Sequence, residues 1–227
     1  MTREGKGPNQ CQKPSGWLGR WVVWNMNSRH SKLTDWGLSH VSIKPRDTIL
    51  DVGCGGGKTV SKLAGIANEG RVYGLDHSEV SVAAARKLNA GWIDKGRVEI
   101  RQGTVSELPF TNAMFELVTA VETHFWWPDL IIGLREVRRV LKTGGTVLIV
   151  AEVYKGATTR TAKLVEQYAP KTGIKLLSVE EHRNLLANAG YGEVRIIEDR
   201  NKGWLCGLGK KPPVEEPGPR GLGTTEA

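Results

Sequence analysis

The stretch Asp51-Val-Gly-Cys-Gly-Gly-Gly-Lys-Thr59 decides the fold of this chain. It follows the apolar, β-type residues 48–50 and precedes a helical pattern that starts at Val60. Glycine has no Cβ, so the turn tolerates positive φ angles and a ligand can lie against its main chain. A strand, a glycine-rich turn and a helix also direct backbone N–H groups and a positive helix terminus toward a ligand. The stretch therefore predicts a ligand-binding turn, and the simpler alternative is a glycine-rich turn that binds nothing.

The spacing of the glycines separates three known loops. A dinucleotide fingerprint, GxGxxG, would need a glycine where Lys58 stands. A phosphate loop, GxxxxGK[ST], would place its first glycine at Val52, and a loop that starts at Gly53 is one residue short. An acidic residue followed by GxGxG does fit, with Asp51, Gly53, Gly55 and Gly57. The spacing thus excludes the two phosphate-binding fingerprints and leaves the third loop.

Strand-like and helical patterns alternate along residues 48–152. Strands are predicted at 48–53, 71–76, 97–102, 115–122 and 146–152, and helices at 57–68, 78–94 and 128–141, the last closed by residues 142–145. Ser78 is expected to cap the second of these helices, whose predicted inner face carries Val80, Ala83, Ala84 and Leu88. Alternation of this kind implies right-handed crossovers and a parallel sheet with helices on both faces.

The pattern changes after residue 152. A helix is expected near residues 159–168 and another at 179–189, which ends at Gly190. Residues 193–198 and 204–209 flank a turn sequence and predict a hairpin. We therefore divide the chain into an N-terminal helical cap at 1–46, a core domain at 47–210 and a flexible tail at 211–227, because the tail has too little apolar surface to fold.

The N-terminal segment is basic and rich in tryptophan. Residues 1–46 hold eight Lys and Arg residues against two acidic ones, within a chain of net charge +8. A helix is expected at 14–28 with three tryptophans on one face, and a second helical pattern spans 25–40. These tryptophans could pack on the core domain, form an aromatic lid over an acceptor pocket, or dock at a membrane interface. The charge favours an anionic partner or is simply a solvated basic surface.

Composition and cysteine usage favour a reduced, cytoplasmic setting. The chain has 227 residues, enough for one large α/β domain. Its three cysteines are far apart and show no CxxC spacing, so reduced thiols are expected. No apolar run is long enough for a membrane helix, and no set of Cys and His residues has the spacing of a metal site.

Four stretches in order carry a resemblance to a known family. They are the 51–59 turn, Gly74-Leu-Asp76, Glu107-Leu-Pro-Phe110 and Leu134 to Gly145, LREVRRVLKTGG. From residue 47 to about 209 the chain resembles class I methyltransferases that use S-adenosylmethionine, and within them the small-molecule branch of ubiquinone and menaquinone enzymes. The resemblance implies a Rossmann-like, seven-stranded sheet in which only the last hairpin strand is antiparallel. It also implies S-adenosylmethionine as cofactor and S-adenosylhomocysteine as product.

The cofactor residues follow from this resemblance and from elementary chemistry. An acid at the end of the second strand lies beside the glycine turn, and its carboxylate can accept two hydrogen bonds from a ribose diol. Asp76 is that acid, while Asp51 and the turn backbone should hold the methionyl end. The predicted cofactor-binding set is Asp51, Gly53, Cys54, Gly55, Gly57, Asp76, His77, Thr104, Val105 and Glu122.

One segment departs from the family pattern. Many relatives have an aspartate in a Gly-Asp-Ala segment after the third strand, where it accepts from the adenine amino group. Here Thr104 stands in its place after Gly103, and its hydroxyl can still accept one hydrogen bond while the Val105 N–H donates. His77 stands where relatives often place an apolar residue under adenine, and its ring could stack there.

Methyl transfer from a sulfonium requires alignment, and a general base is optional. The candidates for a base or acceptor anchor are His124, Glu122 and, on the N-terminal segment, His30. Trp126 and Trp127 suggest a flat or apolar acceptor, although core packing is the commoner use of tryptophan.

We expect methyl transfer to a small organic acceptor at oxygen, nitrogen or carbon, by a monomer or homodimer. One alternative is an RNA methyltransferase that uses the basic N-terminal segment to track phosphates. Against it, the chain lacks the Asn/Asp-Pro-Pro-aromatic motif of enzymes that methylate base amines, since Glu122-Thr-His-Phe stands there. Another alternative is a non-catalytic protein that binds S-adenosylmethionine.

Overall fold

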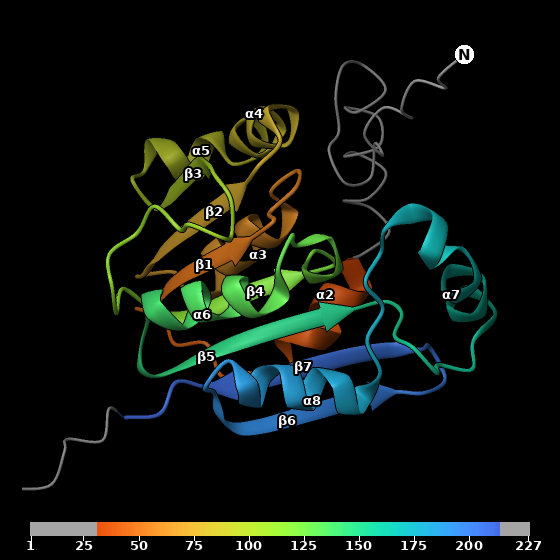
Figure 1. Ribbon diagram of the computed structural model, residues 1–227. Coiled ribbons are helices and arrows are strands. Elements are labelled where there is room, and N and C mark those ends of the chain that lie inside the picture. The colour runs from red at the N-terminus through yellow and green to blue at the C-terminus, as the bar shows by residue number, and fades with distance from the viewer. Residues whose placement is uncertain (1–30, 214–227) are drawn as a thin grey trace, which may run out of the picture.

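The computed structural model describes residues 31–213, and Figure 1 shows one sheet at their centre. The predicted helix at 14–28 and the tail from 214 onward lie outside the described residues. The sheet has seven strands in the order β3-β2-β1-β4-β5-β7-β6. Their bounds are β1 Thr48–Val52, β2 Arg71–Asp76, β3 Val98–Gln102, β4 Phe115–Val121, β5 Leu141–Ala151, β6 Gly192–Asp199 and β7 Trp204–Lys210.

The directions of the strands confirm the predicted fold class. β1 to β5 pair in parallel, and β7 runs antiparallel to both of its neighbours, β5 and β6. β1 lies between β2 and β4, and the strand order reverses between β1 and β4. In open α/β sheets, ligands bind at the carboxyl edge of such a switch point. The glycine-rich turn that follows β1 lies there.

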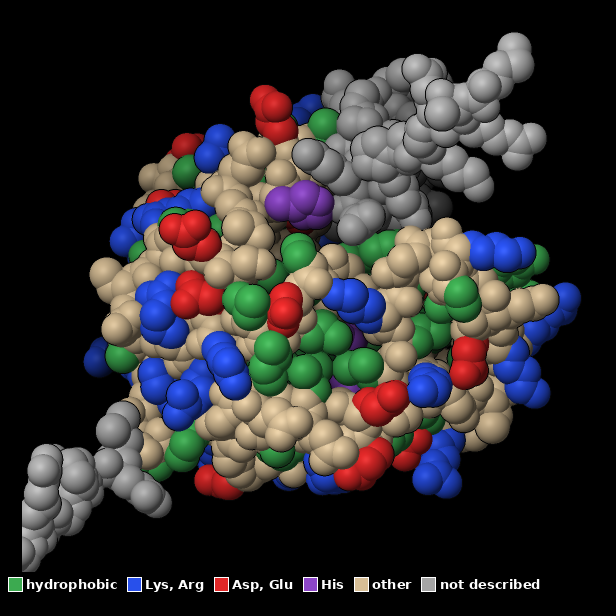
Figure 2. Space-filling model, viewed as in Figure 1, with side chains coloured by type: hydrophobic (Ala, Val, Ile, Leu, Met, Phe, Trp, Pro, Cys, Tyr) green, Lys and Arg blue, Asp and Glu red, His purple; other side chains and the backbone are tan. Residues whose placement is uncertain are grey.

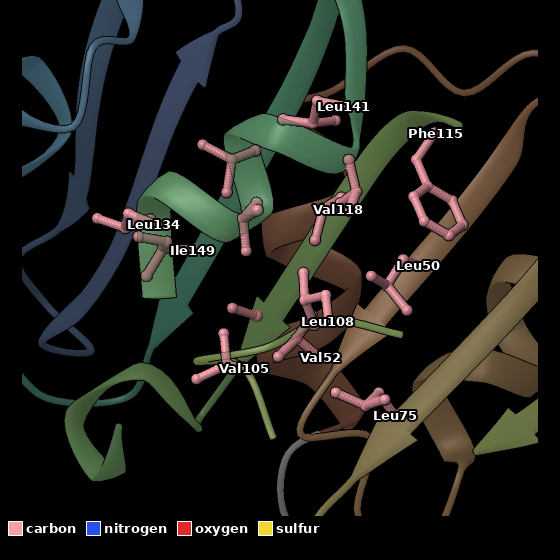
Figure 3. Packing of buried hydrophobic residues seen from close by; sticks show 14 of the residues in the cluster. Leu50, Val52, Leu75, Val105, Leu108, Phe115, Val118, Leu134, Leu141 and Ile149 are labelled. Carbon is pink, nitrogen blue, oxygen red and sulfur yellow. The ribbon is translucent and has the colours of Figure 1, made fainter. Parts of the chain in front are cut away.

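Two apolar layers hold helices against the faces of the sheet. One layer joins the sheet to α6 (Leu130–Val140) and α8 (Val179–Asn188), and Figure 3 shows Leu134 of α6 packed near Ile149 of β5. The other joins the sheet to α2 (Ser31–Leu38), α3 (Lys58–Ile66) and α4 (Glu79–Leu88). Both layers have fully buried strand residues, as a parallel sheet covered on two faces requires. Figure 1 shows α7 (Arg160–Thr172) beyond the carboxyl end of β5.

Helix α2 contributes directly to the second layer. Leu33 and Leu38 are buried in it. A Cβ atom at Gly37 would lie 2.4 Å from Val150 Cγ2, so the absence of a side chain allows α2 to approach β5 closely. The C-terminal part of the predicted 25–40 helical pattern therefore packs on the sheet.

The predicted inner face of the helix after β2 was wrong by one position. Ser78 caps α4 as expected, and its hydroxyl accepts from the Ser81 N–H. Leu88, however, is 51% exposed, and the predicted row is replaced by Ser81, Val82 and Ala85. Successive helix positions differ by about 100°, so an error of one residue turns the apolar stripe away from the core. The predicted single helix at 78–94 is also divided at Asn89, after which α5 (Ala90–Asp94) begins.

Two further boundaries differ from the prediction. Residues 142–145 do not stand between a helix and a strand, because β5 already begins at Leu141, which pairs with Phe115. The register of β4 and β5 then shifts, and Gly144 takes a positive φ of 76° within the irregularity. Helix α7 runs to Thr172, four residues beyond the expected end, with Pro170 inside its last turn.

Candidate active site

The glycine turn folds back on the end of β2. The Gly53 and Cys54 N–H groups both donate to the Leu75 carbonyl, at 2.7 and 2.9 Å. Gly53 has a φ of 73°, and a Cβ atom there would lie 2.0 Å from Thr123 Oγ1. The turn therefore requires glycine at this position for both its backbone conformation and its close approach to the residues after β4. Burial and two nearby carboxylates raise the pKa of the Cys54 thiol, which leaves the residue's backbone as its contribution to the turn.

Asp76 joins the glycine turn to the next helix. Its Oδ2 accepts from the Gly55 N–H and its Oδ1 from the Ser78 N–H, both at 2.9 Å. Each carboxylate oxygen has two acceptor positions, so capacity for a further ligand remains on both. The side chain is only 8% exposed, so these backbone donors hold the carboxylate in one orientation.

A cavity of about 340 Å³ opens beside Asp76 at the carboxyl edge of the sheet. Five predicted cofactor residues line it: Gly53, Asp76, His77, Thr104 and Val105. The opposite wall consists of residues that follow β4, in and around the short 3₁₀ helix η1 (His124–Trp126). They are Thr123, Trp126, Trp127 and Pro128, with Val52, Leu75 and Gly103 completing the lining. The tryptophans were predicted to contact an acceptor, whereas Thr123 and Pro128 carried no signal beyond their position after a strand.

Asp51 lies behind this cavity, outside its lining, at 2% exposure. Its Oδ1 accepts a hydrogen bond of 2.6 Å from the Thr119 hydroxyl. Burial is the largest cause that raises the pKa of Asp51, to about 7. The Thr119 hydrogen bond lowers this pKa, and the nearby Asp76 carboxylate raises it. Asp51 can therefore change its charge near neutral pH when a cation arrives.

Asn89 is a supporting residue that the sequence did not reveal. It is fully buried, and its amide donates to the carbonyls of Gly57 and Ala85 at 3.0 and 2.9 Å. A Cβ atom at Gly57 would lie 2.5 Å from the Asn89 amide nitrogen. Asn89 thus holds the last glycine of the turn, and only its burial within a helix break distinguishes it from a solvated helix-end residue.

Thr104 lines the cavity where relatives often carry an aspartate. Its Oγ1 accepts from the Ser106 N–H at 3.3 Å, and its backbone forms an isolated bridge to Glu107. The hydroxyl is therefore held by a local turn, as Thr side chains often are. Its role toward adenine stays a prediction.

Glu122 directly follows β4 and has a conformation that is rare for a residue with a side chain. Its φ is 57°, its N–H donates to the Val150 carbonyl at 2.9 Å, and its carboxylate accepts from the Glu152 N–H. These bonds join the ends of β4 and β5. The left-handed conformation costs about 1–2 kcal/mol for a non-glycine residue. The hydrogen bonds of Glu122 to β5 hold this conformation, which sets the direction in which the chain enters η1. Glu122 lies outside the cavity lining.

His124 is buried at 1% exposure and lies outside the cavity lining. Its Nε2 is 3.0 Å from Nε2 of His182, whose Nδ1 lies 2.8 Å from the Ser178 carbonyl. A carbonyl only accepts, so His182 donates from Nδ1 and receives the His124 Nε2–H. Burial lowers the pKa of both rings, that of His124 most strongly. A neutral, buried His124 ring supports the η1 turn. The roles of His124 and Glu122 as a base stay predictions. His30, the third candidate, lies outside the described residues.

The residues present fit S-adenosylmethionine. Asp76 offers oriented acceptors to a ribose diol, and the apolar walls at Val105 and Trp127 suit an adenine ring. Gly55 leaves main chain open to a ligand, because a Cβ atom there would meet nothing within 4 Å, and Asp51 behind the turn supplies an acid for an ammonium group.

Comparison with known proteins agrees with this geometry. Residues 49–145 match the family described as "Methyltransferase domain". The chain is 30% identical over 152 residues to the O-methyltransferase cnsE of Penicillium expansum, a match that spans 67% of this chain and 54% of that protein. Residues 49–145 therefore form a class I, S-adenosylmethionine-dependent methyltransferase domain. This also fits the family-typical sheet with one antiparallel strand.

Other relatives support this assignment of the chain. It is 36% identical over 109 residues to the demethylmenaquinone methyltransferase of Bacillus mycoides, which is 48% of this chain and 46% of that protein. The putative methyltransferase solved with the Trm112 activator of Haloferax volcanii has the same fold, with a TM-score of 0.73 and 22% identity over 87% of this chain and 96% of that one. The chain spans about half the length of the curated relatives it matches.

Residues 31–213 contain neither a helix suited to cross a membrane nor a side-chain cluster suited to bind a metal ion. None of the helices described there is long and apolar enough to cross a membrane. Within the same range, His, Cys, Asp and Glu side chains form no group of three that could hold a metal ion.

Proposed function

We propose that this protein transfers a methyl group from S-adenosylmethionine to a small organic acceptor with an oxygen, nitrogen or carbon nucleophile. The observation that carries the proposal is the Asp76 carboxylate, held by the Gly55 and Ser78 N–H groups beside a cavity of about 340 Å³. The match of residues 49–145 to the methyltransferase domain, and relatives named as an O-methyltransferase and a demethylmenaquinone methyltransferase, support it.

The protein's contribution to this reaction is binding and alignment. When bound, the cofactor supplies an activated methyl group and a neutral thioether leaving group. Asp76 and the glycine turn would fix the nucleoside and the amino-acid tail, while the η1 wall would exclude water and orient the acceptor. Alignment alone is worth about 7–11 kcal/mol of barrier in favourable cases, so the reaction needs no base buried in the cavity.

Titration calorimetry with S-adenosylhomocysteine tests the cofactor assignment. Asp76→Asn keeps one acceptor for the turn but loses the charge and part of the ribose contact, so affinity should fall roughly 10-fold or more. Asp94→Asn, on α5, is a matched control and should bind like the wild type. Unchanged affinity in Asp76→Asn would remove the proposed role.

Product formation tests catalysis separately. Incubation with S-adenosylmethionine and a panel of phenols, hydroquinones and amines should yield S-adenosylhomocysteine with at least one acceptor class. Binding of the cofactor without product across the panel would favour a non-catalytic binding protein. Product only with RNA, lost steeply between low and moderate salt, would favour the RNA alternative instead.

A further inference from the structure

The cavity wall formed by η1 is anchored by a segment that lies outside the cavity lining. Residues 173–178, which connect α7 to α8 and which we name the α7–α8 linker, run past the end of this wall. The Lys175 N–H donates to the Phe125 carbonyl at 3.2 Å. The Lys175 ammonium donates to the carbonyls of Trp127, at 2.9 Å, and Pro128. One residue of the linker therefore donates hydrogen bonds to three carbonyls of the tryptophan wall, those of Phe125, Trp127 and Pro128.

Lys175 is exposed as a whole, but its ammonium is a charged donor, and its contact with the Trp127 carbonyl is partly buried. Trp127 and Pro128 lie outside a regular helix, so their carbonyls lack helical partners. A hydrogen bond from a charged donor is roughly twice as strong as one between neutral groups. The Trp126 carbonyl accepts none of these bonds. Lys175 therefore holds the backbone before Trp126, at Phe125, and after it, at Trp127 and Pro128.

A second contact anchors the same turn from α8. His182, in the first turn of α8, meets His124, the first residue of η1, at 3.0 Å between their Nε2 atoms. The linker ends in a capping box in which Ser178 and Glu181 satisfy one another's backbone N–H groups, so its connection to α8 is fixed. Figure 2 shows apolar side chains gathered on the face where η1, α6 and α8 meet. The linker and α8 thus hold η1 at both of its ends.

We propose that Lys175 is a positioning residue for the cofactor site. By holding the carbonyls of Trp127 and Pro128, it keeps the tryptophan wall at the distance from Asp76 that a nucleoside requires. Its ammonium binds backbone carbonyls of lining residues, and Lys175 itself lies outside the cavity lining. The inference rests on the proposed function, because it assigns a role toward the cofactor of that site.

Calorimetry with S-adenosylhomocysteine, together with thermal melting, tests the inference. Lys175→Met keeps the aliphatic stem but removes the ammonium, and it should weaken binding roughly 2- to 30-fold. Lys175→Arg keeps the charge and the donors, so it should recover most of the lost affinity. Lys171→Met is the matched control, because Lys171 lies near the end of α7 over the Tyr168 ring, away from η1. It should bind like the wild type.

The outcomes separate this inference from the proposed function. Wild-type affinity in Lys175→Met would overturn the positioning role while leaving the cofactor site intact. Failure of the wild type itself to bind S-adenosylhomocysteine would overturn the proposed function first. Equal losses of affinity for S-adenosylhomocysteine in Lys175→Met and Lys175→Arg would also refute positioning by Lys175. The same holds if the loss of affinity follows a general fall in melting temperature that Lys171→Met shares.

Discussion

The Thr119 hydroxyl donates to Asp51 Oδ1 over 2.6 Å, and both residues are buried at the end of neighbouring central strands. A single neutral donor compensates only part of the cost of removing a carboxylate from water. Burial therefore raises the pKa of Asp51 to about 7. The ligand-free protein carries an unfavourable group at the place where we expect the ammonium of the cofactor.

Asp51→Asn should stabilise the ligand-free protein at pH 8 by about 1–3 kcal/mol, because it removes a buried charge and keeps an acceptor for Thr119. The folded pKa of about 7 lies above the ordinary aspartate pKa of 3.8, so the folded state binds more protons between these two pH values. Stability at this site therefore falls as the pH rises from about 4 to 7, and the variant should lack that fall. Urea denaturation at pH 5 and pH 8 measures both effects. Thr119→Val should destabilise at pH 8; an Asp51→Asn protein less stable than the wild type there would contradict the argument.

Cofactor binding at pH 7 should release protons. About half of the Asp51 side chains are protonated near their pKa of about 7, and an ammonium group beside them favours the carboxylate. Calorimetric titrations of S-adenosylhomocysteine in two buffers of different ionisation enthalpy should then give different apparent enthalpies. The difference should vanish in Asp51→Asn. Equal enthalpies for the wild type at pH 7 would show that no cation binds at Asp51.

Two glycines of the turn should respond differently to alanine. A Cβ atom at Gly57 would lie 2.9 Å from the Ala85 backbone, and φ there is 80°, whereas a Cβ atom at Gly55 meets nothing within 4 Å. Gly55→Ala should therefore cost about 1 kcal/mol of strain, and Gly57→Ala clearly more, because strain and overlap add. Chemical denaturation of the pair compares them directly. Equal losses of stability would mean that the overlap at Gly57 relaxes without cost.

The sequence was informative where local rules act. The glycine spacing, the acid at residue 76 and the alternation of strands and helices predicted the sheet and one wall of the cavity, because each depends on adjacent residues. The predicted strand β2 agrees at both ends with Arg71–Asp76. The turn chemistry of Ser78 likewise gave the start of α4.

The opposite wall could not be predicted in the same way. His182 follows the His124 position by 58 residues, and Lys175 follows Trp127 by 48, so no local pattern links them. His124 was predicted as a candidate base or acceptor anchor after a strand, and its burial against His182 depends on the packing of α8. The phase of α4 failed for a related reason: alanines and a leucine suit either side of a helix, and contact with Gly57 and the sheet decides which side is buried.

Glu122 offers a test of backbone strain. Glu122→Ala and Glu122→Gly both remove the carboxylate that accepts from the Glu152 N–H, but only glycine adopts a φ of 57° freely. The glycine variant should therefore be about 1 kcal/mol more stable than the alanine variant, in spite of the general cost of glycine. Thermal or urea melting of the two proteins gives this difference. An alanine variant of equal or greater stability would show that the turn into η1 relaxes once the side chain is removed.

The buried pair of His124 and His182 should make the protein sensitive to acid. Burial lowers the folded pKa of both rings below 6.5, so the unfolded chain takes up protons first as the pH falls. The stability from this pair is fully present above pH 6.5 and is lost below it, by up to about 1.4 kcal/mol per pH unit for each ring. His124→Gln should lower stability at pH 7.5 but should show a shallower loss between pH 6.5 and 5 than the wild type. Parallel stability profiles of the two proteins in that range would mean that the rings accept protons without unfolding, and that the η1 wall tolerates a charged histidine.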